Sequence, residues 1–316
     1  MRRKVLMGLA MLAAAAMPLA TSAGSGALPA SAAPAPAPAA VTTAAQAAPF
    51  TLGNVACSLI AVPAARGTGG VPLTTAAAAA KEGKLPVGIG TCPGVRPGAV
   101  VETKVGLCTL NFLFTAPDGE RFIGTAGHCI LGGDSELAGD NGGEKTWAKG
   151  TGPEAKDAAG HRIGEFAYAV LQDPKDFSLI RIDPGIQASP EMCDFGGPTG
   201  INNDISDGPR VLEYWGNGIG IGKALPARSA IALGFPNADH VYAAGLALPG
   251  DSGSAVITED GRAVGVLVTV GIHGFGIDQN GIDAGTIGIT RLAPQLARAS
   301  QVLGTPLTLV TAGGAK

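Results

Sequence analysis

Glycine recurs along this sequence: 49 of its 316 residues are glycine, and a further 23 are proline. Short segments rich in Val, Ile, Leu and Phe lie between them. Apolar segments bounded by turn-forming residues are typical of β-strands, whereas frequent glycine destabilises helices. The pattern therefore predicts an all-β fold with many turns, in a chain long enough for one large domain or two small ones.

Charge gives no indication of a polyanionic partner. Charged residues make up only 15% of the chain, and the net charge is −3. Binding to nucleic acid or to an anionic membrane surface is favoured by an excess of positive charge, which this chain lacks. We therefore expect no nucleic acid as a partner and, after removal of an N-terminal signal, no membrane.

The first 32 residues have the pattern of a secretory signal peptide. Residues 1–4 read Met-Arg-Arg-Lys, and residues 5–20 form an apolar stretch that is short for a membrane-spanning helix. Small-residue cleavage sites follow, the better of them at 30–32. An uncleaved anchor is the alternative, but no long apolar run supports it. We expect a signal peptide over residues 1–32 and a secreted, extracellular protein.

Two further segments precede the motifs that carry chemistry. Residues 33–50 are rich in Ala and Pro and lack the large apolar side chains that offset the entropy of folding, which predicts a flexible linker. Residues 51–100 are either an N-terminal extension of the mature protein or a pro-segment. The sequence does not decide between these two.

His128 lies in the string Gly-Thr-Ala-Gly-His-Cys, which ends at Cys129. Apolar side chains alternate along residues 108–115, which predicts a strand that begins at Cys108. A Pro-Asp-Gly turn at 117–119 would bring a second strand back towards it. We therefore predict a disulfide between Cys108 and Cys129 that holds the histidine-bearing turn. An ordinary core histidine is the alternative, but it fits poorly beside a cysteine pair in an exported chain.

Asp176 stands at the entrance of a second apolar segment, since residues 176–183 read Asp-Phe-Ser-Leu-Ile-Arg-Ile-Asp. A carboxylate in this place can accept a hydrogen bond from the Nδ1–H of His128, select its tautomer and stabilise the imidazolium. Most isolated aspartates belong to turns or caps, and Asp173 and Asp183 are rival candidates.

Ser252 lies in the third motif, where residues 248–254 read Leu-Pro-Gly-Asp-Ser-Gly-Ser. A serine hydroxyl attacks a carbonyl only with an adjacent base. The flanking glycines allow a tight conformation that exposes Oγ and directs several N–H groups into one concavity. The N–H groups of Gly250 and Ser252 are therefore candidates for an oxyanion hole. Taken alone, the string could also be a surface turn.

The order of these motifs along the chain, His128, then Asp176, then Ser252, resembles the chymotrypsin (trypsin-like) serine protease family in its bacterial secreted form. The resemblance runs from about Cys108 to the C-terminus, and the order differs from that of α/β-hydrolases and of subtilisins. It implies a serine endopeptidase that acts through an acyl-enzyme on Ser252. His128 would be the general base and acid, and Asp176 would orient it.

The resemblance also implies an architecture of two six-stranded antiparallel β-barrels with a C-terminal helix, and a monomer that acts on protein or peptide substrates without a cofactor. Apolar residues at helical spacing within 290–303 agree with the helix. An acidic loop at 134–144 lacks a regular spacing of ligands, so we expect no metal. The expected ranges are 101–193 for the first barrel, 194–207 for the connection, 208–303 for the second barrel and helix, and 304–316 for a tail.

Asp251, which precedes the serine, needs a partner if it is buried, because an unpaired buried carboxylate is costly. In animal members of the family that partner is a new N-terminal ammonium group, but no matching start precedes Cys108 here. Bacterial members use an internal arginine. The resemblance therefore suggests Arg210, just before a predicted strand at 211–216, as the structural partner of Asp251.

The chain has five cysteines, so at least one is left over if only intramolecular bridges form. Besides the bridge between Cys108 and Cys129, the resemblance favours Cys92 with Cys193, because chymotrypsin joins its N-terminal segment to the inter-barrel connection. Cys57 would then be unpaired. A bridge between Cys57 and Cys92 is the alternative.

Substrate specificity is also inferred from the resemblance. The base of the S1 pocket would be Leu246, and its wall would be formed by Val268, Thr269 and Val270. An apolar base offers no anion to bind Arg or Lys, so we expect small or medium apolar P1 side chains. His273 could instead favour an acidic P1 residue.

Two other classes of function remain. A catalytically silent binding protein could use the same scaffold, since some members of the fold have lost catalysis. An esterase would use the same nucleophile, but on another fold with another order of residues.

Overall fold

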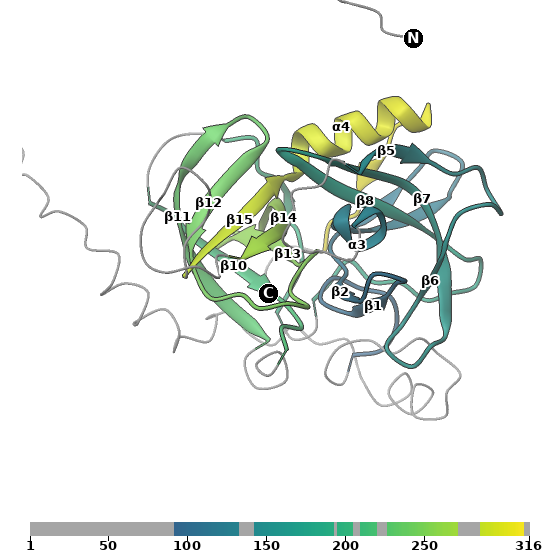
Figure 1. Cartoon of the computed structure of the whole chain (residues 1–316), viewed down its shortest axis with the longest axis horizontal. Coiled ribbons are helices and arrows are strands. Elements are labelled where there is room, and N and C mark those ends of the chain that lie inside the picture. Colours follow the sequence, from purple (N-terminus) through teal and green to yellow (C-terminus); the bar gives the residue numbers. More distant parts are fainter. Residues whose placement is uncertain are drawn as a thin grey trace, which may run out of the picture. The chain divides into compact units, whose positions relative to one another are not determined.

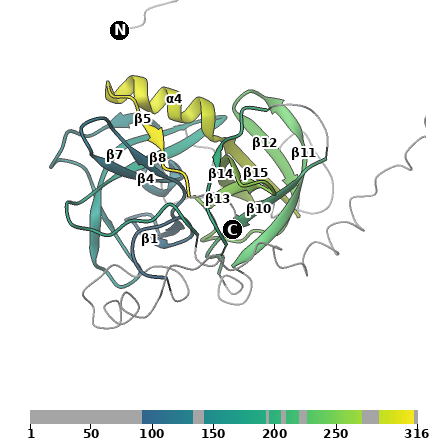
Figure 2. The ribbon, with the colours of Figure 1, turned by 180° about the vertical axis from the view of Figure 1, so that it is seen from behind.

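The computed structural model describes residues 92–132, 142–192, 195–204, 209–219, 226–270 and 285–312. These residues form two antiparallel β-sheet systems, and the C-terminal helix is the longer of the two helices found in them. Figure 1 shows β10 to β15 grouped together and β1, β2 and β5 to β8 grouped beside them, and Figure 2 shows the same two groups from behind. The predicted signal peptide and linker, and residues 51–91 of the predicted extension, lie outside the described residues.

The first barrel is a ring of six antiparallel segments. Its pairing order is β3-β4-β8-β7-β6-β1-β2, and β2 and β3 are two halves of one extended stretch. Between them Leu110 N donates to Ala99 O over 2.8 Å, and Asn111 N donates to Gly124 O over 2.7 Å, so the ladder continues and the ring closes. The strands are β1 (Val100–Glu102), β2 (Leu107–Thr109), β3 (Leu113–Thr115), β4 (Arg121–Thr125), β6 (Glu154–Lys156), β7 (Arg162–Gln172) and β8 (Lys175–Ile182), with β5 (Gly143–Thr146) added on β7.

The second barrel is a ring of six strands that closes through the pairing of β13 with β14. A short further strand, β9 (Gly200–Ile201), runs parallel to β14 outside the ring. Both rings confirm the predicted fold of two six-stranded barrels. The strands of the second ring are β10 (Val211–Trp215), β11 (Ala227–Asn237), β12 (His240–Ala244), β13 (Ala255–Thr258), β14 (Arg262–Val270) and β15 (Thr286–Arg291).

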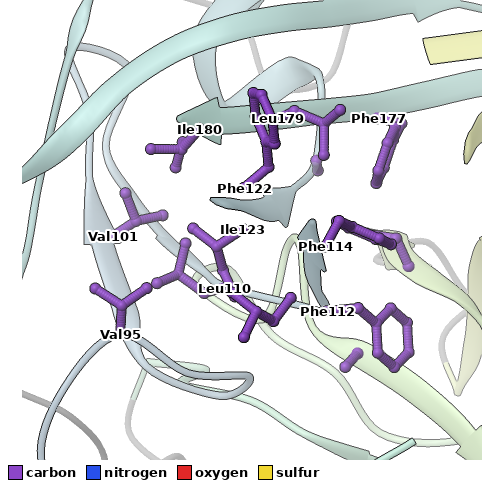
Figure 3. Close-up of a cluster of buried hydrophobic side chains, with 14 of the residues drawn as sticks. Val95, Val101, Leu110, Phe112, Phe114, Phe122, Ile123, Phe177, Leu179 and Ile180 are labelled. Atoms are coloured by element: carbon purple, nitrogen blue, oxygen red, sulfur yellow. The ribbon is translucent and has the colours of Figure 1, made fainter. Parts of the chain in front are cut away.

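The core of the first barrel is built from the alternating apolar residues that the sequence shows around the first motif. Leu110, Phe112 and Phe114 are at most 1% exposed, and Phe114 packs edge-on against Phe177 of β8 with ring centroids 6.3 Å apart. Figure 3 shows these side chains converging from both sides of the ring. Burial of each such side chain contributes about 1.5–3 kcal/mol. This core supports both β4, which leads to His128, and β8, which carries Asp176.

Helix α4 (Leu292–Leu303) follows β15 and confirms the predicted C-terminal helix. Its inward residues Leu292, Leu296 and Ala299 are buried. The helix ends at Gly304, whose φ of 67° is readily adopted only by glycine. No helix among the described residues is long and apolar enough to cross a membrane.

The described part of the predicted tail, residues 304–312, contains a strand. This strand, β16 (Thr308–Leu309), pairs antiparallel with β3 of the first barrel. Val310 N then donates to Leu113 O over 2.8 Å. The chain thus returns from the helix that follows the second barrel to the edge of the first.

Candidate active site

His128 begins the short helix α3 (His128–Leu131), at the end of the loop that follows β4. The predicted disulfide between Cys108 and Cys129 is present and ties this turn to β2. Gly127 allows the close approach of the neighbouring strand, since a Cβ there would lie 1.9 Å from Val170 O. The glycine and the cysteine of the first motif thus both serve to position the histidine.

Asp176 holds His128 by two hydrogen bonds. Its Oδ2 lies 2.7 Å from His128 Nδ1, and its Oδ1 accepts from His128 N over 2.9 Å. Asp176 is 8% exposed, on β8. A carboxylate at Nδ1 favours the tautomer in which this nitrogen is protonated, which leaves Nε2 as the proton acceptor. The rival Asp183 instead binds Arg162 Nε over 2.7 Å.

The loop that carries Ser252 is held by hydrogen bonds to both barrels, through Thr109 of the first and Leu267 of the second. Thr109 N donates to Ser252 O over 2.8 Å, and Gly253 N donates to Leu267 O over 2.7 Å. Gly253 has a φ of 93°, and a Cβ there would lie 3.1 Å from Ala126 N, two residues before His128. The serine motif and the histidine motif, on different barrels, therefore meet at this seam.

Two N–H groups of the serine loop are available to a ligand. Within the described part of the chain, neither Gly250 N nor Ser252 N donates a hydrogen bond. By contrast, the N–H groups of Asp251, Gly253 and Ser254 all have acceptors. Buried or half-buried backbone N–H groups are nearly always paired, so two unpaired donors in one tight loop are typical of an anion-binding site. They are the pair that the sequence suggests for an oxyanion hole.

The prediction that Arg210 is the partner of Asp251 is wrong. Arg210 lies near the surface, where its Nη2 is 2.5 Å from Asp204 Oδ2. The partner is Arg228 of β11, whose Nη2 and Nη1 donate to the two oxygens of Asp251 over 2.5 and 2.7 Å. Burial alone would lower the pKa of Arg228, but its hydrogen bonds to Asp251 outweigh this effect and the pKa is raised.

The remaining bonds to Asp251 come from the backbone. Leu248 N and Gly218 N donate to its carboxylate over 2.8 and 2.6 Å. Asp251 is fully buried, yet both its oxygens are satisfied. The sequence signal for Arg228 is its place in a segment of small and apolar residues, Ala-Arg-Ser-Ala-Ile-Ala, and in the structure it lies opposite Tyr214. Its guanidinium lies 5.0 Å from the centre of that buried ring.

Some of the predicted S1 residues lie next to the loop that carries Ser252. Leu246 is half-buried, and its carbonyl oxygen accepts hydrogen bonds from Tyr214 OH and from Arg228. Val268 is buried on β14, beside the serine loop. Thr269 and Val270 also belong to β14. Their side chains, and all of His273, lie outside the described residues, so the pocket remains a prediction.

No metal site follows from the histidine and the cysteines around it. Cys108, His128 and Cys129 place potential ligand atoms within 4.8 Å of one another. The two sulfur atoms are joined in the disulfide, however, so neither offers a thiolate to a metal.

Cys92 is also disulfide-bonded. Cys57 and Cys193 lie outside the described residues, so the predicted pairing of Cys92 with Cys193 remains a prediction.

Comparison with known proteins finds similarity at the level of structure only. No protein-family model matches the chain, and no curated protein matches it either. Among solved structures, Protease A of Thermobifida fusca is similar with a TM-score of 0.46 and 16% identity, over 69% of this chain and 98% of that one.

Two further structures are similar to the same extent. The protease NAPase of Nocardiopsis has a TM-score of 0.45 and 18% identity, over 69% of this chain and 99% of its own. A glutamic acid specific serine protease, described as using a histidine triad in substrate binding, has a TM-score of 0.45 and 15% identity, over 68% of this chain and 100% of its own. The two-barrel arrangement described above is the architecture that the resemblance to chymotrypsin-like proteases predicts.

Proposed function

We propose that this protein is a secreted serine endopeptidase in which Ser252 is the nucleophile, His128 the general base and acid, and Asp176 the residue that orients His128. The observation that carries the proposal is that the Asp176 carboxylate, 48 residues further along the chain, accepts hydrogen bonds from both the ring and the backbone N–H of His128. His161 and Asp157 make the same pair of contacts, but they lie four residues apart and the side chain of His161 is 41% exposed. At His128 the aspartate comes from the distant strand β8, and the contact keeps Nε2 as the free acceptor that a catalytic base needs at every turnover.

In the proposed reaction, His128 Nε2 takes the proton of Ser252 Oγ as Oγ attacks the carbonyl carbon of the scissile peptide. The negative charge that develops on the carbonyl oxygen is stabilised by the N–H groups of Gly250 and Ser252. The imidazolium then returns the proton to the leaving amine, and the acyl-enzyme forms. Water, activated by the same histidine, hydrolyses the acyl-enzyme and restores Ser252.

The bonds between Arg228 and Asp251 support a site that is formed without a new N-terminal ammonium group. The guanidinium and two backbone N–H groups already satisfy the carboxylate. Asp251 adjoins Ser252, so this buried pair sets the conformation of the nucleophile loop. We therefore propose that the N-terminal segment, wherever it is cut, is not needed to order the oxyanion hole.

Secretion is supported by the predicted signal peptide and by disulfides at Cys108–Cys129 and at Cys92. Such bonds persist in oxidising compartments and are rare in the cytosol. The substrates we propose are proteins or peptides with a small or medium apolar P1 side chain, cleaved by a monomer without metal or cofactor. A peptide library decides this specificity, and preferred cleavage after Arg or Lys would contradict it. Preferred cleavage after Glu would favour the alternative role of His273.

The test of the activity is labelling of the secreted protein with a fluorophosphonate, followed by mass spectrometry. The wild-type protein should gain one adduct on the peptide that contains Ser252, and Ser252→Ala should gain none. Ser189→Ala is the matched control, because Ser189 lies far from the three motifs in the sequence and its hydroxyl accepts a hydrogen bond from Glu191 N. This variant should gain the same adduct as the wild type. A folded wild-type protein that gains no adduct would favour the silent binding protein.

A further inference from the structure

Thr109 is a polar residue with no exposed surface, at the seam between the two barrels. It ends β2, directly after the disulfide-bonded Cys108. Its N–H donates to Ser252 O over 2.8 Å, and its hydroxyl donates to Gly250 O over 2.7 Å. A residue of the first barrel thus holds both the nucleophile and the glycine of the proposed oxyanion hole.

Chemistry determines the direction of each bond at this hydroxyl. The Gly250 carbonyl can only accept, whereas Asn217 N and Asn217 Nδ2, at 3.3 and 3.2 Å, can only donate. Asn217 Nδ2 also donates to Gly98 O over 2.6 Å, which determines the orientation of that amide. A hydroxyl has one proton and two lone pairs. The proton of Thr109 is therefore directed at Gly250, and both lone pairs are used by Asn217.

The peptide unit after Gly250 is held at both ends. Its carbonyl is bound by Thr109, and its N–H, which belongs to Asp251, donates to Leu248 O over 2.9 Å. Gly250 has a φ of 99°, a conformation that glycine adopts easily and also leaves easily. The orientation of this peptide therefore depends on its hydrogen bonds more than on the local chain.

The peptide unit before Gly250 is held at its carbonyl, since Pro249 O accepts from Ile219 N over 2.9 Å. The C=O and N–H of a trans peptide point in opposite directions. The Gly250 N–H is therefore turned away from Ile219, and it has no acceptor among the described residues. With one peptide held by Thr109 and the other by Ile219, Gly250 N–H has a defined direction.

We propose that Thr109 is a positioning residue for the oxyanion hole. Its hydroxyl holds the Gly250 carbonyl, and this limits rotation about the Gly250 Cα so that the Gly250 N–H stays directed at the oxygen of the substrate. This inference rests on the proposed function, because only an acyl-transfer reaction develops charge at that place. Without the hydroxyl, the Gly250 carbonyl loses its partner and the peptide unit after Gly250 is free to rotate. The peptide unit before it, which carries the Gly250 N–H, then keeps its direction only through the hydrogen bond of Pro249 O with Ile219 N. Substrate would still bind, but the transition state would lose part of its stabilisation.

The experiment compares Thr109→Ser with Thr109→Ala, because both lose the methyl group and only Ala loses the hydroxyl. Removal of one oxyanion donor costs on the order of 10²–10³ in kcat, so misdirection of a donor should cost less. We expect Thr109→Ala to lower kcat about tenfold with KM changed less than about twofold, and Thr109→Ser to keep most of the activity. Thr151→Ala is the control, since that exposed threonine donates to Ala148 O within a turn, and it should match the wild type.

A second readout does not depend on activity. In protein labelled with ¹⁵N-glycine, the amide signal of Gly250 should move in Thr109→Ala and keep its wild-type position in Thr109→Ser. Thermal unfolding shows that each variant is folded, and Thr109→Val, which restores the volume without the oxygen, should behave like Ala.

Three outcomes would count against the idea. Equal loss of kcat in the Ser and Ala variants would assign the effect to the methyl group. An unchanged kcat in both Ala and Val variants would show that Gly250 keeps its orientation without Thr109. If the wild type itself gains no fluorophosphonate adduct, the proposed function fails. The claim that Thr109 orients Gly250 is tested separately, and an unmoved Gly250 signal in Thr109→Ala would overturn it.

Discussion

Arg228 and Asp251 form a fully desolvated ion pair, in which the guanidinium donates to both carboxylate oxygens over 2.5 and 2.7 Å. Asp251 has no exposed surface, and Arg228 is 5% exposed. A buried ion pair adds little to stability compared with an apolar pair of the same shape, but removal of one partner leaves a charge without compensation. The pair therefore serves to specify the conformation of the loop around Ser252 rather than to stabilise the fold.

Arg228→Met should destabilise the protein by about 3–5 kcal/mol, because it leaves the Asp251 carboxylate buried and without its cation. Catalysis should fall with it, since the loop of Ser252 loses its anchor. The free energy of unfolding in urea measures the first effect. Arg210→Met is the control and should change stability by at most about 1 kcal/mol, because the ion pair of Arg210 with Asp204 is partly solvated. Equal effects of the two substitutions would contradict our assignment.

Asp176→Asn should lower kcat by about 10⁴-fold, the size of the effect for this change in a chymotrypsin-type triad. The amide would favour the wrong tautomer of His128, while the fold should remain intact because the amide is nearly the same size. Steady-state kinetics on a peptide substrate measures the loss. Asp183→Asn, at the rival aspartate that binds Arg162, should leave kcat within about twofold, since that carboxylate does not contact His128.

His240 should make the fold less stable in acid. It is 7% exposed, and burial lowers the pKa of its ring, although Pro174 O and the carboxylates of Asp173, Asp176 and Asp239 oppose the shift. The lowered pKa means that the unfolded chain binds the proton more tightly than the folded protein does. The stability contributed by the neutral ring is therefore complete above the unfolded value of about 6.5 and is lost as the pH falls below it.

The measurement is the free energy of unfolding at pH 7.5 and at pH 5.0. His240→Gln should lose less stability over this interval than the wild type does, because Gln does not titrate. His161→Gln is the control, since the side chain of His161 is 41% exposed beside Asp157. If the free energy of unfolding falls by the same amount between pH 7.5 and pH 5.0 in the wild type and in His240→Gln, His240 is not the group responsible.

Leu309→Ala should destabilise the protein by about 2–3 kcal/mol, at the lower end of the range for a buried leucine because this site lies on an edge strand. Leu309 is 8% exposed on β16, where it pairs with Phe114 of β3. Thr308→Ala, at the exposed neighbouring position, should cost within about 0.5 kcal/mol. Urea denaturation of both variants checks the prediction. A Leu309→Ala variant as stable as the wild type would show that the strand adds nothing to the first barrel.

Patterns in the sequence predict well those parts of the structure that are formed by residues close together in the chain. The Cys108–Cys129 bridge and the strand between residues 108 and 115 follow from alternation and a turn signal, and the structure contains both. Helix α4 follows from apolar spacing in the same way. The string around Ser252 likewise carries its own glycines, which give the loop its two positive φ values, at Gly250 and Gly253.

Contacts between distant segments could not be read in this way. The sequence shows that Asp251 needs a cation, but Arg210 and Arg228 are equally plausible partners until the register of β10 and β11 is known. The pairing of β10 with β11 places Arg228 opposite the buried Tyr214, whereas Arg210 lies just before the other end of β10, where it binds Asp204 near the surface. A shift of one residue in that pairing would have exchanged the inward and outward faces.

The sequence by itself determined the class of fold, the order of the three motifs and the bridge beside His128, because each depends on residues close together in the chain. Only the tertiary structure decided that Arg228 binds Asp251, that Thr109 binds Gly250, and that β16 closes on β3. These contacts join residues far apart in the chain, with a separation of 141 residues between Thr109 and Gly250 and a larger one between the paired residues of β3 and β16. Their formation depends on strand register and on the packing of one barrel against the other, which no local pattern specifies.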